Sequence, residues 1–165
     1  MIPSTTYISN LLSDVDTRFR KASSVGASND LLTILSKFAV MELSGWCEES
    51  LDEVYNDVKI KIIDKDSIDI IDEKIKFVSS FDRKTFESMI GLFGVLKFER
   101  ELSTTEKADY DKFLTTISKL YKLRCKNAHA HIKKILVITK PSDLQIYLND
   151  INKGFILIDR VISTI

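Results

Sequence analysis

Apolar residues recur every three or four positions along most of the chain, which is the spacing of helices that each bury one face. The pattern predicts helices over residues 5–22, 30–60, 66–79, 83–96, 105–128 and 142–163. Gly91 and Gly94 interrupt the fourth of these and permit a bend or a stop. Residues 132–140 are rich in β-branched side chains, which favour an extended conformation. This segment could form a single strand. We therefore expect one all-α domain over residues 1–165, a bundle of five to six helices.

Polar residues at the predicted helix starts strengthen this interpretation. Ser28 or Asn29 is suited to cap the second helix, because its side-chain oxygen accepts a free backbone N–H. Ser103 and Glu106 have the spacing of a capping box at the start of the fifth helix. After the break at Lys140 and Pro141, Ser142 is the predicted N-cap of the last helix.

Composition agrees with a helical protein. Only 5 Gly and 2 Pro occur in 165 residues, too few turn formers for a many-stranded sandwich or barrel. The formal net charge is zero, which excludes a protein that coats nucleic acid through bulk charge. The N-terminal residues lack the pattern of a signal peptide, and the longest uncharged apolar-rich run, about 88–96, is shorter than the ~20 residues that span a bilayer. We expect a cytoplasmic protein without a membrane segment.

The densest polar cluster lies at the end of the fifth predicted helix. The only two histidines, His129 and His131, follow Arg124 there. Arg124 comes four residues after Leu120 and three after Tyr121, so it falls on the apolar stripe. A guanidinium on a packed face requires a carboxylate partner, a wet cleft or an anionic ligand. Taken alone, the position is more simply explained by an arginine that reaches the surface near a helix end, or that pairs with a core Asp or Glu.

The helical spacing also relates the polar residues to one another. On a regular helix, His129 is rotated about 140° around the axis from Arg124 and lies ~7.5 Å further along it. The two side chains of one regular helix therefore do not point toward the same place. Symmetric pairing of two copies would bring His129 of one chain near Arg124 of the other. Asn127 lies within about 60° of Arg124 and can share its site. The apolar stripe is expected to continue to Ala128.

The segment Arg124-Cys-Lys-Asn-Ala-His129 resembles the Arg-x4-His motif of HEPN domains. These are small all-α proteins that include many ribonucleases of toxin–antitoxin and antiviral defence systems. Segments 42–50 and 86–94 resemble the corresponding helices of bacterial HEPN families, closest to the RiboL-PSP and MAE-type groups. Cys125 differs from the polar residue that commonly follows the arginine. His131 stands where many toxin members carry a tyrosine that is modified.

The resemblance implies metal-independent cleavage of RNA by its 2′-hydroxyl, leaving 2′,3′-cyclic phosphate and 5′-OH ends, with no cofactor and no metal. His129 would act as general base or acid. Arg124 would hold the scissile phosphate, and Asn127 would orient the motif or bind the phosphate. Lys126 and His131 are auxiliary candidates. The implied partners are RNA, a second copy that completes a composite active site, and an antitoxin or sensor protein. The alternative is a catalytically silent HEPN module for dimerisation, nucleotide binding or regulation.

Two other chemistries use the same residues. Cys125, His129 and His131 could form a metal cluster, but a structural zinc site needs four ligands and Cys47 is distant in sequence. Cys125 with His129 could form a nucleophilic pair, but no third member is apparent. Both remain less favoured than the HEPN interpretation.

The long second helix also carries an acidic face, with Glu48, Glu49, Asp52, Glu53 and Asp57. We expect this face to be solvated, and attraction of a basic partner is the alternative. Trp46 lies on the apolar side of the same helix. It is expected to fill the core, although a place near the motif helix is also open.

Overall fold

The computed structural model describes residues 3–61, 66, 68, 69, 72, 73, 81–93, 98, 100–129 and 138–164. Within these residues it contains five helices of more than one turn, and no strand. They are α1 (Thr5–Ser24), α2 (Asn29–Lys61), α4 (Arg83–Phe93), α6 (Thr104–His129) and α7 (Pro141–Thr164). The predicted all-α fold is confirmed.

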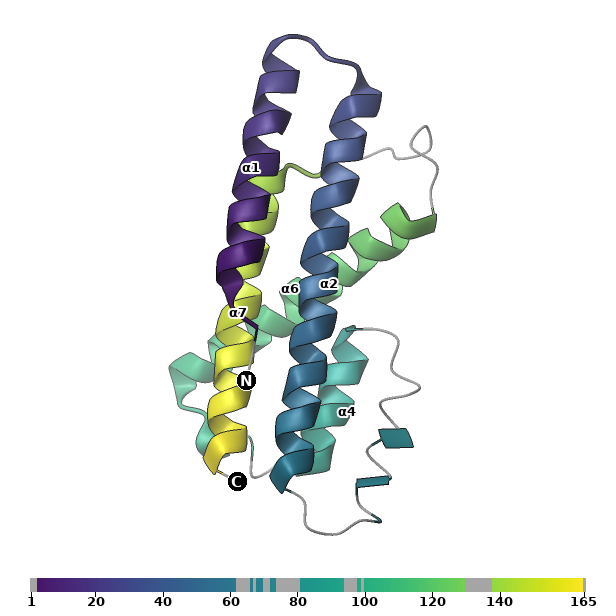
Figure 1. Cartoon of the computed structure of the whole chain (residues 1–165). Helices are drawn as coiled ribbons and strands as arrows, with labels where there is room; N and C mark the ends of the chain where they lie inside the picture. The colour runs from purple at the N-terminus through teal and green to yellow at the C-terminus, as the bar shows by residue number, and fades with distance from the viewer. Residues whose placement is uncertain are drawn as a thin grey trace.

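Three long helices run side by side, and α6 crosses them. Figure 1 shows α1, α2 and α7 as neighbours, with α6 passing behind α2, and α1, α2 and α7 all contact one another. Helix α6 packs against both α2 and α7, and α4 packs against α6. The turn between α1 and α2 contains Gly26 at φ 68°, a left-handed conformation that glycine adopts without strain. No helix in the described part of the chain has the length and apolarity needed to cross a membrane.

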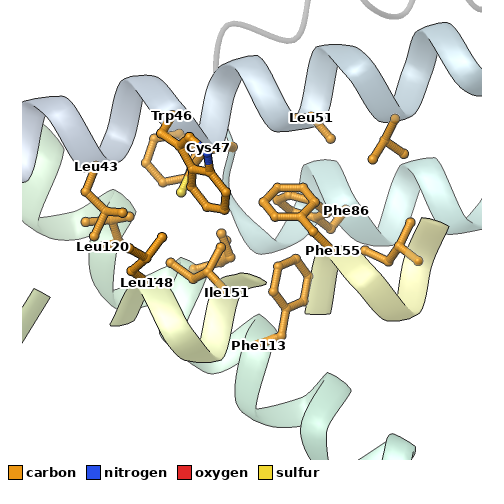
Figure 2. Packing of buried hydrophobic residues seen from close by; sticks show 14 of the residues in the cluster. Leu43, Trp46, Cys47, Leu51, Phe86, Phe113, Leu120, Leu148, Ile151 and Phe155 are labelled. Atoms are coloured by element: carbon orange, nitrogen blue, oxygen red, sulfur yellow. The ribbon is translucent and has the colours of Figure 1, made fainter. Parts of the chain in front are cut away.

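The helices share one hydrophobic core, and aromatic rings form its centre. Phe86, Phe113 and Phe155 come from α4, α6 and α7, and their ring centroids lie 4.9 to 5.6 Å apart in edge contacts. Trp46 of α2 contacts Phe155 edge-on at 5.8 Å, and Figure 2 shows these side chains together. Trp46 is 6% exposed, which confirms the interpretation that it fills the core.

A glycine sets the distance between α6 and α7. A Cβ atom built on Gly154 would lie 2.1 Å from Cγ of Phe113, far inside van der Waals contact. The absence of a side chain at Gly154 is therefore what lets the Phe113 ring reach the backbone of α7. The contact belongs to the packing of α6 against α7, and α6 packs against α2 as well.

The predicted caps of two helices are confirmed. The backbone N–H of Leu31 donates to Oγ of Ser28 at 3.4 Å. At the start of α6, the N–H of Ser103 donates to Oε2 of Glu106 at 2.8 Å, and the N–H of Glu106 donates to Oγ of Ser103 at 3.3 Å. Both halves of the capping box are thus formed.

The predicted cap of the last helix is wrong. Helix α7 begins at Pro141, so Ser142 is already inside it. The backbone N–H of Ser142 donates to Oδ1 of Asp16 at 3.1 Å, and Oδ2 of Asp16 pairs with Nε of Arg20 at 2.6 Å. Proline lacks an N–H and suits the first helical position, and a carboxylate from α1 replaces a local cap. Asp16 is 8% exposed, and α1 and α7 are joined by a partly buried polar contact.

Helix boundaries otherwise follow the prediction within about three residues. The predicted helix 66–79 lies largely outside the described residues, although 66, 68, 69, 72 and 73 are helical. Residues 94–97, which include Gly94 and the predicted end of the fourth helix, also lie outside them. Of the expected extended stretch 132–140, only 138–140 are described, and they are not helical.

Candidate functional site

Arg124 lies where α6 crosses α2, and a carboxylate from α2 pairs with it. Nη2 of Arg124 is 2.6 Å from Oε1 of Glu48. The two side chains are 26% and 36% exposed, so the pair is neither buried nor fully solvated. Of the solutions expected for a guanidinium on a packed face, the structure adopts the carboxylate partner.

Aromatic rings complete the surroundings of Arg124. Its Cζ lies 5.9 Å from the ring centroid of Phe81, within the range of a cation–π interaction. Phe81 is fully buried and contacts Tyr121 edge-on at 5.8 Å, one turn before Arg124 on α6. The guanidinium is therefore oriented by a ring as well as by a carboxylate. Its Nε is buried and has no hydrogen-bond partner among the described residues.

The electrostatics of Glu48 differ from those of a surface glutamate. Burial raises the pKa of Glu48, Arg124 lowers it, and Asp52 one turn further along α2 raises it again. The net direction is upward, so this carboxyl takes a proton more readily than an ordinary glutamate. The neighbouring Cys47 is fully buried, and burial followed by the charge of Glu48 raises the pKa of its thiol well above the usual value. Cys47 is accordingly an inert packing residue.

Glu48 is the residue that sequence reasoning missed. The acidic face of α2 was expected to be solvated, and Glu49 and Asp52 are indeed exposed. Glu48 departs from this expectation because it borders the packed face. It follows Ser44 by four residues and precedes Leu51 by three, and both are buried. That helical spacing was the available signal.

Asn127 faces the interior of the structure. It is 5% exposed, and its Nδ2 donates to the carbonyl oxygen of Leu123 at 2.8 Å. Its Oδ1 is buried without a partner among the described residues. Ala128 is exposed, so the expected continuation of the apolar stripe to Ala128 is wrong. The inward face instead passes from Arg124 to Asn127, three residues on, and a polar amide occupies its end.

The remaining predicted residues lie around the end of α6. Lys126 is exposed, and Cys125 is a free, partly buried cysteine. His129 is the last residue of the helix, but its side chain lies outside what the structure describes, and so does all of His131. The structure thus places Arg124 and Asn127 on one face and adds Glu48. Their relation to His129 stays a prediction.

The described residues contain no group of three or more His, Cys, Asp or Glu side chains that could hold a metal ion. The suggested cluster of Cys125, His129 and His131 falls partly outside them. Comparisons with protein-family models, curated proteins and solved structures find no match for the chain.

Proposed function

We propose that this protein is a metal-independent endoribonuclease of the HEPN type, cleaving RNA to 2′,3′-cyclic phosphate and 5′-OH ends. The observation that carries the proposal is Arg124, a partly exposed guanidinium held in a fixed orientation on a packed helix face. It stands five residues before one of the only two histidines in the chain. Transphosphorylation requires both a preoriented cation and a group that titrates near neutrality.

Arg124 binds the scissile phosphate in this mechanism. A guanidinium has five N–H donors in a planar fork, and charge-assisted bonds to phosphate oxygens are among the strongest in proteins. Glu48 contacts Nη2 of Arg124. The Arg124 side chain is 26% exposed, so it remains within reach of a ligand. Negative charge that develops on the phosphorus oxygens is then stabilised without reorganisation of the protein.

His129 moves protons at the 2′-hydroxyl or at the leaving 5′-oxygen. Because helical spacing separates it from Arg124, the working site is composite and forms in a homodimer. Asn127 is buried and bonded to its own helix, so its role is to hold the last turn of α6. Lys126 and His131 are auxiliary phosphate-binding candidates. RNA is the substrate, and an antitoxin or sensor protein is a proposed partner.

A catalytically silent HEPN module is the second candidate. The pair between Glu48 and Arg124 favours it, because an internal carboxylate neutralises the guanidinium without any ligand. Such a module would bind RNA or a nucleotide, or would dimerise, without cleaving RNA.

Cleavage of total cellular RNA in EDTA tests the proposal. EDTA removes metal-dependent contaminants, and the matched variants are Arg124→Ala, His129→Ala and Lys122→Ala. Lys122 is an exposed cation on the same helix, so its loss controls for charge. We expect cleavage with cyclic phosphate ends by the parent and Lys122→Ala, and a loss of about 100-fold or more in the other two. A folded parent that leaves RNA intact but binds it through Arg124 would instead favour the silent module.

A further inference from the structure

Cleavage by a 2′-hydroxyl needs two proton transfers at separate places. One group must take the proton of the 2′-hydroxyl, and another must give a proton to the 5′-oxygen as it leaves. The HEPN motif supplies His129 for one of these tasks. The structure adds a second titratable group to the site, because Oε1 of Glu48 lies 2.6 Å from the guanidinium that would hold the phosphate.

We propose that Glu48 is a catalytic residue of this site, the base that takes the proton of the 2′-hydroxyl, and that His129 is the acid that protonates the leaving oxygen. This inference rests on the proposed ribonuclease function. It assigns the base role to a carboxylate from α2, outside the motif on α6.

The position of Glu48 suits the role. A phosphate that binds Arg124 lies next to the carboxylate that contacts the same guanidinium, so the attached ribose is brought close to Glu48. The side chain is 36% exposed, which leaves it accessible to a ligand. Its immediate neighbour Glu49 is on the solvated face of α2, so only one of the two adjacent glutamates can take part.

The charged surroundings keep Glu48 usable as a base. Arg124 faces it from α6 and favours the ionised form, while Asp52 on α2 and burial act in the opposite direction and raise its pKa overall. A carboxylate with a raised pKa is a stronger base than an ordinary one. Cys47, the other titratable neighbour on α2, has a raised pKa and stays protonated.

The step balances without a metal or cofactor. The proton of the 2′-hydroxyl passes to the Glu48 carboxylate, and a bond forms between the 2′-oxygen and phosphorus. The bond from phosphorus to the 5′-oxygen breaks, and that oxygen takes the proton of the His129 imidazolium. Glu48 ends protonated and His129 neutral, and exchange with water restores both before the next turnover.

The test is the pH dependence of RNA cleavage in EDTA by the parent, Glu48→Gln, Glu48→Asp and the matched control Glu49→Gln. Gln keeps an acceptor for Arg124 but cannot take a proton. We expect the rate of Glu48→Gln to fall about 100-fold or more and the decline of the parent rate at low pH to disappear. Glu48→Asp should retain that decline at a reduced rate, and Glu49→Gln should match the parent. Thermal unfolding confirms that each variant is folded.

Each contrary result has a separate meaning. Cleavage by Glu48→Gln at the parent rate, lost on adding His129→Ala, would overturn the role of Glu48 and leave the ribonuclease function standing. A slower Glu48→Gln with an unchanged pH profile would overturn it too, because the carboxylate would then merely position Arg124. No cleavage by the folded parent and Glu49→Gln would overturn both proposals.

Discussion

The contact between Gly154 and Phe113 allows a sharp prediction about stability. A Cβ at position 154 would lie 2.1 Å from Cγ, 2.2 Å from Cδ2 and 2.5 Å from Cβ of Phe113. Carbon atoms in contact normally lie about 3.5–4.0 Å apart, so ring and backbone would have to separate by roughly 1.5 Å. Phe113 cannot move away freely, because it is fully buried and its ring contacts those of Phe86 and Phe155.

The magnitude follows from two opposed effects. Overpacking of a core costs about 1–3 kcal/mol, and a contact this short places Gly154→Ala at the upper end. Alanine also favours a helix over glycine by about 1 kcal/mol. We therefore expect a net loss of about 2 kcal/mol in the free energy of unfolding. Gly45→Ala in α2 is the matched control, because nothing lies within 4 Å of its added Cβ, and it should gain about 0.5–1 kcal/mol.

Urea denaturation, followed by far-ultraviolet circular dichroism, measures the free energy of unfolding of both variants and of the parent, and the values are compared at equal m-value. Combining Gly154→Ala with Phe113→Leu should lose less stability than the sum of the two single changes, since the shorter side chain relieves the clash. A Gly154→Ala protein as stable as the parent, or stabilised like Gly45→Ala, would refute the close approach of α6 and α7.

Other predictions concern the site. The pKa of Glu48 is raised, so the folded state holds this proton more tightly than the unfolded chain does. The free energy of unfolding should therefore fall as pH rises from about 4.3 through the raised pKa. Glu48→Gln should flatten this dependence of stability on pH relative to Glu49→Gln. A thiol reagent should modify Cys125 in the native protein and reach the buried Cys47 only on unfolding, and two equally fast thiols would contradict this. If the site is composite, mixing inactive Arg124→Ala and His129→Ala chains under conditions of subunit exchange should recover up to about a quarter of parental cleavage, whereas a site within one chain would recover none.

Local features of the fold were predictable from sequence because their causes are local. The stripe of Ile8, Leu12 and Val15 predicts the buried face of α1, and all three are buried. The capping box of Ser103 and Glu106 depends on residues three apart and is formed as expected. Such features need no knowledge of which helices meet.

Features set by tertiary neighbours were not predictable in the same way. The sequence indicates that Arg124 needs a partner but not that Glu48 supplies it, because the partner depends on where α6 crosses α2. Helix α7 starts one residue early because Asp16, far away in sequence, accepts from its backbone. Asn127 rather than Ala128 ends the inward face, since the packing angle of the helix decides which side is covered.

The pairing of the first described helix with the last bears on how the chain folds during synthesis. Helix α1 packs on α7, and the bond from Ser142 to Asp16 spans 126 positions. A nascent chain therefore emerges from the ribosome with α1 and α2 already made but with part of their apolar surface uncovered. Only after α7 has left the exit tunnel can α1 and α2 pack against it. Until then the growing chain presents an incomplete core, the state in which chaperones bind and aggregation begins.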